Sequence, residues 1–159
     1  MNFGSVPVND AEGCILAHSL TAGGRRFQKG LKLSDEDVAA LQAAGVATVT
    51  VAEIEAGDIS EDAAAEALAR QLLGPDMSLS APFTGRANIF AETPGLLHVD
   101  PASIQAANDV DEAITIATLP EYARVHERQM LATVKIIPYG VSRQAVEEVA
   151  LRLGQGRAM

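Results

Sequence analysis

The sequence predicts an α+β protein made of short strands and three to four short helices. Two observations carry this prediction. Short apolar runs separated by Gly, Pro and Asp recur through the second half of the chain, which is typical of short strands. Helix-start and helix-stop residues also recur at helical spacing. The strands are expected to form small mixed β units that resemble a small barrel or a sandwich.

Residues 1–74 are expected to form a strand-helix-strand-helix unit. The pair Gly23-Gly24 predicts a turn between two short strands. Ser34 and Asp37 have the spacing of a capping box in which Asp replaces Glu, so a helix is expected to begin there. Gly45 is expected to end this helix, because glycine adopts the left-handed conformation that a helix C-terminus often needs.

The rest of this unit is predicted from residues 46–74. Residues 46–54 are rich in Val, Thr and Ile, which favours a strand. Ser60 is expected to cap a second helix, and the dipeptide Gly74-Pro75 to end it. A domain boundary is therefore expected near Gly74.

The remainder is expected to divide into a β-rich unit, 75–141, and a C-terminal helix with a frayed tail, 142–159. Asp100 is the natural cap of a brief helix that ends near Asn108. The C-terminal helix is expected to end at Gly154, which leaves residues 155–159 as the frayed end.

Composition and charge exclude some classes of function. The formal net charge is -9, and the aromatic content is 4% with no Trp. An acidic chain repels a phosphate backbone, and few aromatic rings are available to stack on bases, so no nucleic-acid partner is expected. No segment approaches the length of a membrane span, so no membrane partner is expected either. The single cysteine, Cys14, excludes an internal disulfide and fits a reducing, cytoplasmic setting.

Nothing in the sequence forms a catalytic or metal-binding constellation. None of the three histidines has a partner at metal-ligand spacing, and no Gly-x-Ser-x-Gly elbow is present. Cys14 lies in an apolar run, where a thiol acts as a small apolar side chain. The expectation is therefore no catalytic residue and no metal site, with enzymatic activity of the chain itself left open but not favoured.

The best candidate binding residues are Thr84, Gly85, Arg86 and Lys135. In the Thr84-Gly85-Arg86 segment, glycine would let the backbone come close to a ligand, and the arginine could fork onto a phosphate or carboxylate. The alternative is a structural turn held by an Arg86 salt bridge. Lys135 lies inside an apolar strand, so it either faces solvent from an edge strand or points a cation at a pocket.

Several stretches together carry a resemblance to a known family. They are Val6-Pro7-Val8, AEGCILAHS (11–19), Lys29-Gly30 with Leu33-Ser34, APFTGRAN (81–88), NDVDEAIT (108–115) and ATVKIIP (132–138). In these stretches the chain resembles the N-terminal part of the MoeA-like molybdopterin-binding proteins. The resemblance extends over almost the whole chain and stays in register.

This resemblance implies a cytoplasmic role in molybdenum cofactor biosynthesis, with molybdopterin as the cofactor. In such proteins a downstream α/β domain holds the main pterin-phosphate loop, so the matched region is expected to be an accessory domain. The implied partner is that downstream domain or a second copy of the chain. The alternative is a structural or dimerisation module with no small-molecule ligand, which would use its strand edges or its acidic helical face.

Overall fold

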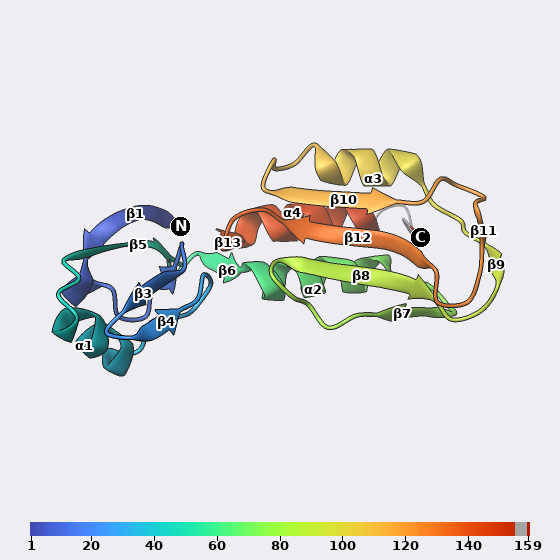
Figure 1. Cartoon of the computed structure of the whole chain (residues 1–159). Coiled ribbons are helices and arrows are strands. Elements are labelled where there is room, and N and C mark those ends of the chain that lie inside the picture. The colour runs from blue at the N-terminus through green and yellow to red at the C-terminus, as the bar shows by residue number, and fades with distance from the viewer. Residues whose placement is uncertain (155–158) are drawn as a thin grey trace. The chain divides into compact units, whose positions relative to one another are not determined.

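The computed structural model describes residues 1–154 and Met159, which form two compact units, 1–56 and 57–159. The predicted α+β class is confirmed, because four helices and many short strands in several small sheets make up this part of the chain (Figure 1). Every strand pairing in it is antiparallel. None of its sheets closes into a barrel.

The first unit contains a three-stranded sheet and a hairpin. Strand β5 (Thr48–Glu53) lies between β1 (Asn2–Pro7) and β2 (Ile15–Leu16). Strands β3 (Leu20–Ala22) and β4 (Arg25–Phe27) pair on either side of the two glycines, as predicted. A short 3-10 helix, Val8–Asp10, follows β1.

Helix α1 (Asp35–Ala43) has both of its predicted ends. Ser34 and Asp37 form the reciprocal capping box. At the other end, Gly45 has a φ of 76°, and the amide of Val46 donates to the carbonyl of Leu41, which closes a Schellman motif. The buried core of the unit lies beneath this helix, and its residues are Val8, Ala11, Cys14, Leu16, Phe27, Leu33, Val38, Leu41, Val49 and Val51.

The second unit is built on a four-stranded sheet in the order β10, β12, β8, β7. The strands are β7 (Met77–Leu79), β8 (Arg86–Ala91), β10 (Ile114–Thr118) and β12 (Met130–Ile136). Buried and more exposed residues alternate along β8 and along β10, so one face of the sheet is packed and the other is not.

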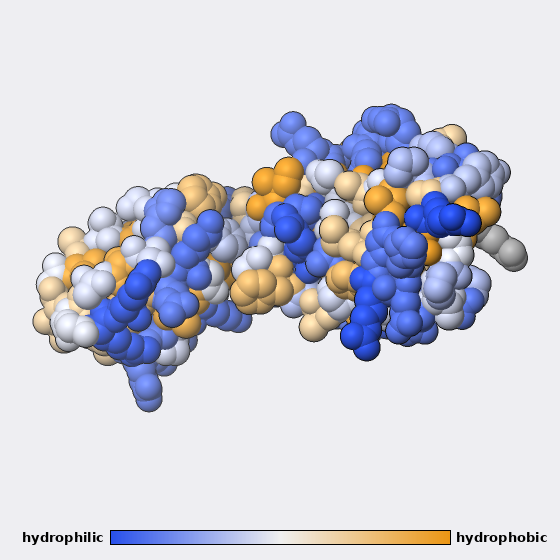
Figure 2. All heavy atoms as spheres, turned by 45° about the vertical axis from the view of Figure 1, so that its right-hand side comes forward, coloured by the Kyte–Doolittle hydropathy of each residue, from blue (hydrophilic) through white to orange (hydrophobic). Residues whose placement is uncertain are grey.

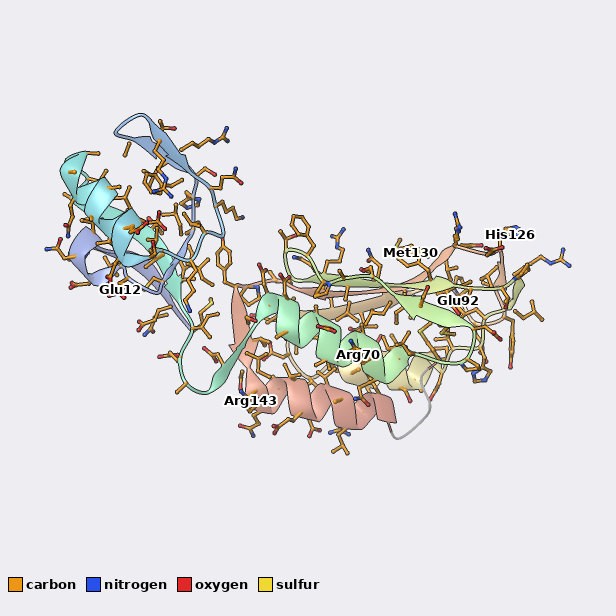
Figure 3. All side chains as sticks on the ribbon, turned by 90° about the horizontal axis from the view of Figure 1, so that it is seen from below. Glu12, Arg70, Glu92, His126, Met130 and Arg143 are labelled. Carbon is orange, nitrogen blue, oxygen red and sulfur yellow. The ribbon has the colours of Figure 1, made fainter. Side chains whose placement is uncertain are left out.

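Helices cover only one face of this sheet. Helix α2 (Glu61–Leu72) packs on β8 and β12, α3 (Pro101–Asn108) packs beside β10, and α4 (Arg143–Gly154) contacts both helices. Figures 1 and 3 show α2 and α4 on the same side of the sheet from two directions. No helix of the described residues lies on the opposite face, which is called the open face below.

Two further pairs of short strands complete the second unit. Strand β6 (Asp58–Ser60) pairs with β13 (Gly140–Ser142), and β9 (Gly95–Leu96) pairs with β11 (Arg124–Val125). The side-chain amide of Asn108 donates to the carbonyl of Ile116 and accepts from its N–H, at 2.9 and 2.8 Å. These two bonds give the backbone N–H and carbonyl of Ile116 partners on the outer edge of β10, where no further strand pairs.

The division between the units falls after Ala56 and not near Gly74. Helix α2 was predicted to belong with the first unit, but its buried residues join the core of the second. Helix α4 belongs to that core as well. The β-rich unit and the C-terminal helix, which were predicted as separate parts, therefore belong to one unit with α2. The predicted frayed end falls mainly on residues 155–158, which lie outside the described residues.

Hydrophobic and hydrophilic side chains are intermixed on the surface of the second unit. In Figure 2 separate hydrophobic patches lie among hydrophilic side chains. The large apolar side chains exposed on this unit are Phe83, Leu96, Tyr122, Met130, Ile137 and Leu151. None of the helices in the described part of the chain is both long enough and apolar enough to cross a membrane.

Candidate functional site

Thr84, Gly85, Arg86 and Lys135 lie together at one end of the four-stranded sheet. Phe83 and Arg86 exchange backbone hydrogen bonds of 2.9 and 3.2 Å, which closes a hairpin turn. The two central residues, Thr84 and Gly85, have φ angles of 49° and 69°, as a type I′ turn requires. Lys135 pairs with Arg86 in register, and its Nζ donates to the carbonyl of Thr84 at 2.5 Å.

Gly85 allows α2 and β12 to lie close to the backbone of the turn. Its N–H donates to Asp62 Oδ1 of α2 at 2.7 Å, and its carbonyl accepts from the N–H of Ile136 at 2.7 Å. A Cβ at this position would lie 2.6 Å from the Ile136 oxygen and 2.7 Å from Glu61 Oε2. The sequence left two interpretations of this glycine open, the approach of a ligand and a structural turn. The contacts with α2 and β12 are those of a structural turn.

Arg86 and Lys135 form a pair of cations on the open face. Directly opposite residues of antiparallel strands point to the same face, with Cβ atoms about 5 Å apart. Lys135 lies on β12, which is a central strand, so the edge-strand alternative is wrong. Arg86 is exposed, and its side chain makes no ion pair within the described part of the chain. The turn is therefore held by Asp62 and Lys135, not by an Arg86 salt bridge.

The next pair along the open face was not singled out from the sequence. Asn88 of β8 lies opposite Thr133 of β12. Asn88 Oδ1 and Thr133 Oγ1 are both buried, and neither has a hydrogen-bond partner among the described residues. Leaving a buried polar atom unsatisfied costs about 1–3 kcal/mol, so two such atoms side by side are an unusual feature of a folded chain.

A third pair follows at the far end of β8. Phe90 lies opposite Met130 of β12 and Ser78 of β7. Figure 3 shows Met130 on the side of the sheet away from α2 and α4. A cavity of about 330 Å³ lies next to this pair, and its lining residues are Ser78, Phe90, Ala91, Glu92, Glu127 and Arg128.

Two other cavities of the second unit lie around β9 and β11. The larger, about 520 Å³, is lined by Leu96, Arg124 and His126 among others, and a neighbouring one of about 300 Å³ reaches His98. Neither is lined by any of the four residues predicted from the sequence. They are therefore separate from the cation pair.

The first unit holds a cavity of about 440 Å³ that Cys14 lines together with Asp10, Glu12 and Glu53. Burial raises the pKa of the Cys14 thiol, and the charge of Glu53 raises it further. The thiol therefore stays protonated at neutral pH and is a poor nucleophile. In the described residues, no three His, Cys, Asp or Glu side chains gather into a group that could hold a metal ion.

Comparison with known families gives one match, to a domain of unknown function (DUF8806), over residues 5–53. The matched residues all fall within the first compact unit, 1–56. A comparison of the chain with curated proteins finds no match. The cation pair of the second unit lies outside the matched segment.

Proposed function

We propose that this chain is an accessory N-terminal domain of a molybdopterin-binding protein of the MoeA-like kind, acting in molybdenum cofactor biosynthesis. The proposal starts from the resemblance of six stretches of sequence to that family. The structural observation that carries it is the Arg86–Lys135 pair. These two cations are 49 positions apart in the chain, and the fold brings them side by side on an open face.

The chemistry of this pair suits an anionic ligand. Two like charges on adjacent strands repel each other, and a bound anion converts that repulsion into attraction. An arginine guanidinium matches the geometry of a phosphate with two parallel hydrogen bonds, and a lysine adds a point charge. The phosphate of molybdopterin is the group that Arg86 and Lys135 would contact, while Thr84 and Gly85 keep the turn in place.

In this proposal the chain contributes binding and positioning, and the chemistry belongs to a partner. The partner is a downstream molybdopterin-binding domain or a second copy of the chain, and the setting is the cytoplasm. In a chain of net charge -9, two adjacent cations on one face give an anion a local attraction that the acidic surface elsewhere does not.

The proposal is tested by titrating the purified chain with molybdopterin under anaerobic conditions, beside Arg86→Ala. Saturable binding that weakens about tenfold or more in the variant is expected, because a charge-assisted hydrogen-bonded contact is lost. Arg124→Ala is the matched control, since Arg124 is also exposed and lies at a different cavity. Equal affinity in all three proteins would contradict the proposal.

A second candidate function is an interaction module without a small-molecule ligand. Two apolar side chains flank the cation pair: Phe83 is 76% exposed and Ile137 is 63% exposed. Exposed aromatic and aliphatic groups beside arginine are typical of interface anchors. Sedimentation over a range of concentrations tests self-association, and a monomer at every concentration would count against dimerisation.

A further inference from the structure

Strand β1 is an edge strand with outward-pointing backbone groups. It pairs only with β5 in the three-stranded sheet of the first unit (Figure 1). The backbone N–H of Val8 donates to the Ala47 carbonyl at 3.1 Å and continues the register of this pairing. Because hydrogen-bonded and non-hydrogen-bonded pairs alternate along an antiparallel ladder, the even-numbered residues of β1 bond to β5. The N–H and carbonyl groups of Phe3 and Ser5, and the carbonyl of Pro7, therefore point away from the sheet.

This edge is open to pairing with a further strand. Among the described residues, no hydrogen bond reaches the outward groups of Phe3 or Ser5. Charged side chains and bulges are the usual means of keeping an edge from pairing, but residues 2–8 carry no charged side chain and the register with β5 has no bulge. Pro7 blocks only the last position of the strand. An extended segment can therefore add to β1 through backbone hydrogen bonds.

Gly4 lies in the middle of this edge and lines the cavity of about 440 Å³ in the first unit. It pairs with the buried Val51, which lines the same cavity. A Cβ on Gly4 would have no atom within 4 Å, and the φ of Gly4 is not positive. Neither packing nor backbone conformation requires glycine here, although glycine weakens a strand. Its missing side chain lets a residue of an added strand reach the cavity from the edge.

The charge of this cavity is negative. Three of the described residues that line it, Asp10, Glu12 and Glu53, are acidic, and none is a Lys, Arg or His. None of the three carboxylates makes an ion pair within the described part of the chain. A hydrogen bond with Asp35 and the charge of that carboxylate raise the pKa of Glu12, so negative charge is crowded at this place. The cavity therefore favours a cationic group.

The charge of the cavity distinguishes between the strands that this edge could accept. A second copy of β1, paired about Gly4, would bring two acidic cavities side by side, and like charges at short range repel each other. A segment with a lysine or arginine opposite Gly4 would instead place its cation among the carboxylates. In an antiparallel arrangement this residue and Gly4 form a non-hydrogen-bonded pair, in which side chains lie closest, and both point to the face of the cavity.

We infer that the edge of β1 binds an extended, antiparallel segment of a partner protein that carries a lysine or arginine opposite Gly4. The backbone of the segment pairs with Phe3 and Ser5, and its cation enters the acidic cavity. The inference goes beyond the proposed function, because this site belongs to the first unit and shares no residue with the Arg86–Lys135 pair of the second.

The test uses a seven-residue peptide with acetyl and amide ends, Thr-Thr-Val-Lys-Val-Thr-Thr, as the probe. Its lysine is its only charge, and a valine stands on each side because aromatic and β-branched residues on adjacent strands stabilise each other, as a valine opposite Phe3 would. Binding to the full chain is followed through the amide resonances of β1 and through hydrogen exchange. The expected result is saturable binding, with slower exchange of the Phe3 and Ser5 amides.

Altered peptides separate the contribution of the backbone from that of the charge. A peptide with glutamate in place of lysine is expected to bind about tenfold more weakly, because the cavity then repels it. A peptide with norleucine at the same position should bind about fivefold more weakly than the lysine peptide, because the attraction is lost without repulsion. The lysine peptide with N-methyl groups on both valines should not bind, because these amides are the donors to the carbonyls of Phe3 and Ser5.

Variants of the chain test the cavity itself. Gly4→Val keeps the backbone edge but blocks the way into the cavity, so the lysine and norleucine peptides should bind it equally. Its melting temperature should not fall, since the added side chain meets no atom within 4 Å at its Cβ and valine favours a strand. Glu53→Gln should weaken the lysine peptide about threefold. Glu36→Gln is the matched control, because Glu36 is exposed and does not line the cavity.

Equal affinity for the lysine and glutamate peptides would overturn the inference. So would the absence of binding, or binding that leaves the exchange of the Phe3 and Ser5 amides unchanged. Exchange that slows with protein concentration when no peptide is present would assign this edge to a second copy of the chain and would overturn the inference as well. Each of these outcomes is independent of the molybdopterin titration, which reports on the second unit.

Discussion

At the scale of single residues, Gly85 shows how the candidate site is held in place. It combines a left-handed backbone with contacts to α2 and β12 that leave no room for a side chain. Asp62 and Ile136 together fix both of its backbone polar groups. The position of the neighbouring Arg86 therefore depends on a buried glycine.

We expect Gly85→Ala to destabilise the second unit by about 2–3 kcal/mol, because it adds strain at positive φ to a steric conflict with backbone. The conflict is with the Ile136 oxygen, 2.6 Å from the added Cβ. Urea unfolding followed by circular dichroism measures the change. Gly95→Ala is the control, since nothing lies within 4 Å of its Cβ position and its φ is not positive, so little change is expected. Equal stabilities of the two variants would show that the turn relaxes freely.

At the scale of elements, α1 depends on the charge of one buried carboxylate. The backbone N–H of Ser34 donates to Asp37 at 3.1 Å and is the main cause that lowers the pKa of Asp37 below its usual value of 3.8. The Ser34 hydroxyl and Arg25, whose Nη2 lies 2.7 Å from the carboxylate, lower it further. Because the pKa is depressed in the folded state, the stabilisation is complete above the unfolded pKa and is lost as the pH falls through the folded pKa.

Asp37→Asn is therefore expected to lower the stability of the first unit by about 1 kcal/mol at pH 7. The difference in stability from the native chain should shrink as the pH falls below about 4. It should vanish once Asp37 is protonated in both the folded and the unfolded native chain. Urea unfolding followed through NMR signals of the first unit measures this. Glu36→Gln, in the same helical turn but exposed, should change stability by only a few tenths of a kcal/mol. A difference that is the same at pH 7 and at pH 2 would contradict the role of the charge.

The elements also show how far a sequence can predict this fold. The ends of α1 are predictable because a capping box and a Schellman glycine act within a few residues. The four candidate residues do lie together, and Gly85 also makes contacts with α2 and β12 that the sequence did not predict. The Asn88–Thr133 pair and the central position of Lys135 depend on strand order and register. Those are tertiary properties that no local pattern of Lys135 or Asn88 contains.

At the scale of the whole molecule, the boundary between units follows packing and not the strongest local break. Gly74-Pro75 ends α2, and a helix stop near a change in composition predicts a domain boundary there. A helix stop, however, does not indicate which core the helix joins. Helix α2 contributes five residues to the core of the second unit, and they are Ala64, Ala65, Leu68, Ala69 and Leu72.

This assignment predicts how fragments behave. Residues 57–159 should fold alone, because the core cluster of the second unit contains only residues from this range. Residues 75–159 should not fold, because they lack α2 and the bond from Gly85 to Asp62. Replacing one buried leucine by alanine costs about 2–5 kcal/mol, and removing Leu68, Leu72 and three alanines together exceeds the stability of most domains. Amide NMR dispersion and cooperative urea unfolding distinguish the fragments. A dispersed spectrum from residues 75–159 would place the boundary at Gly74. It would also show that the sheet folds without α2.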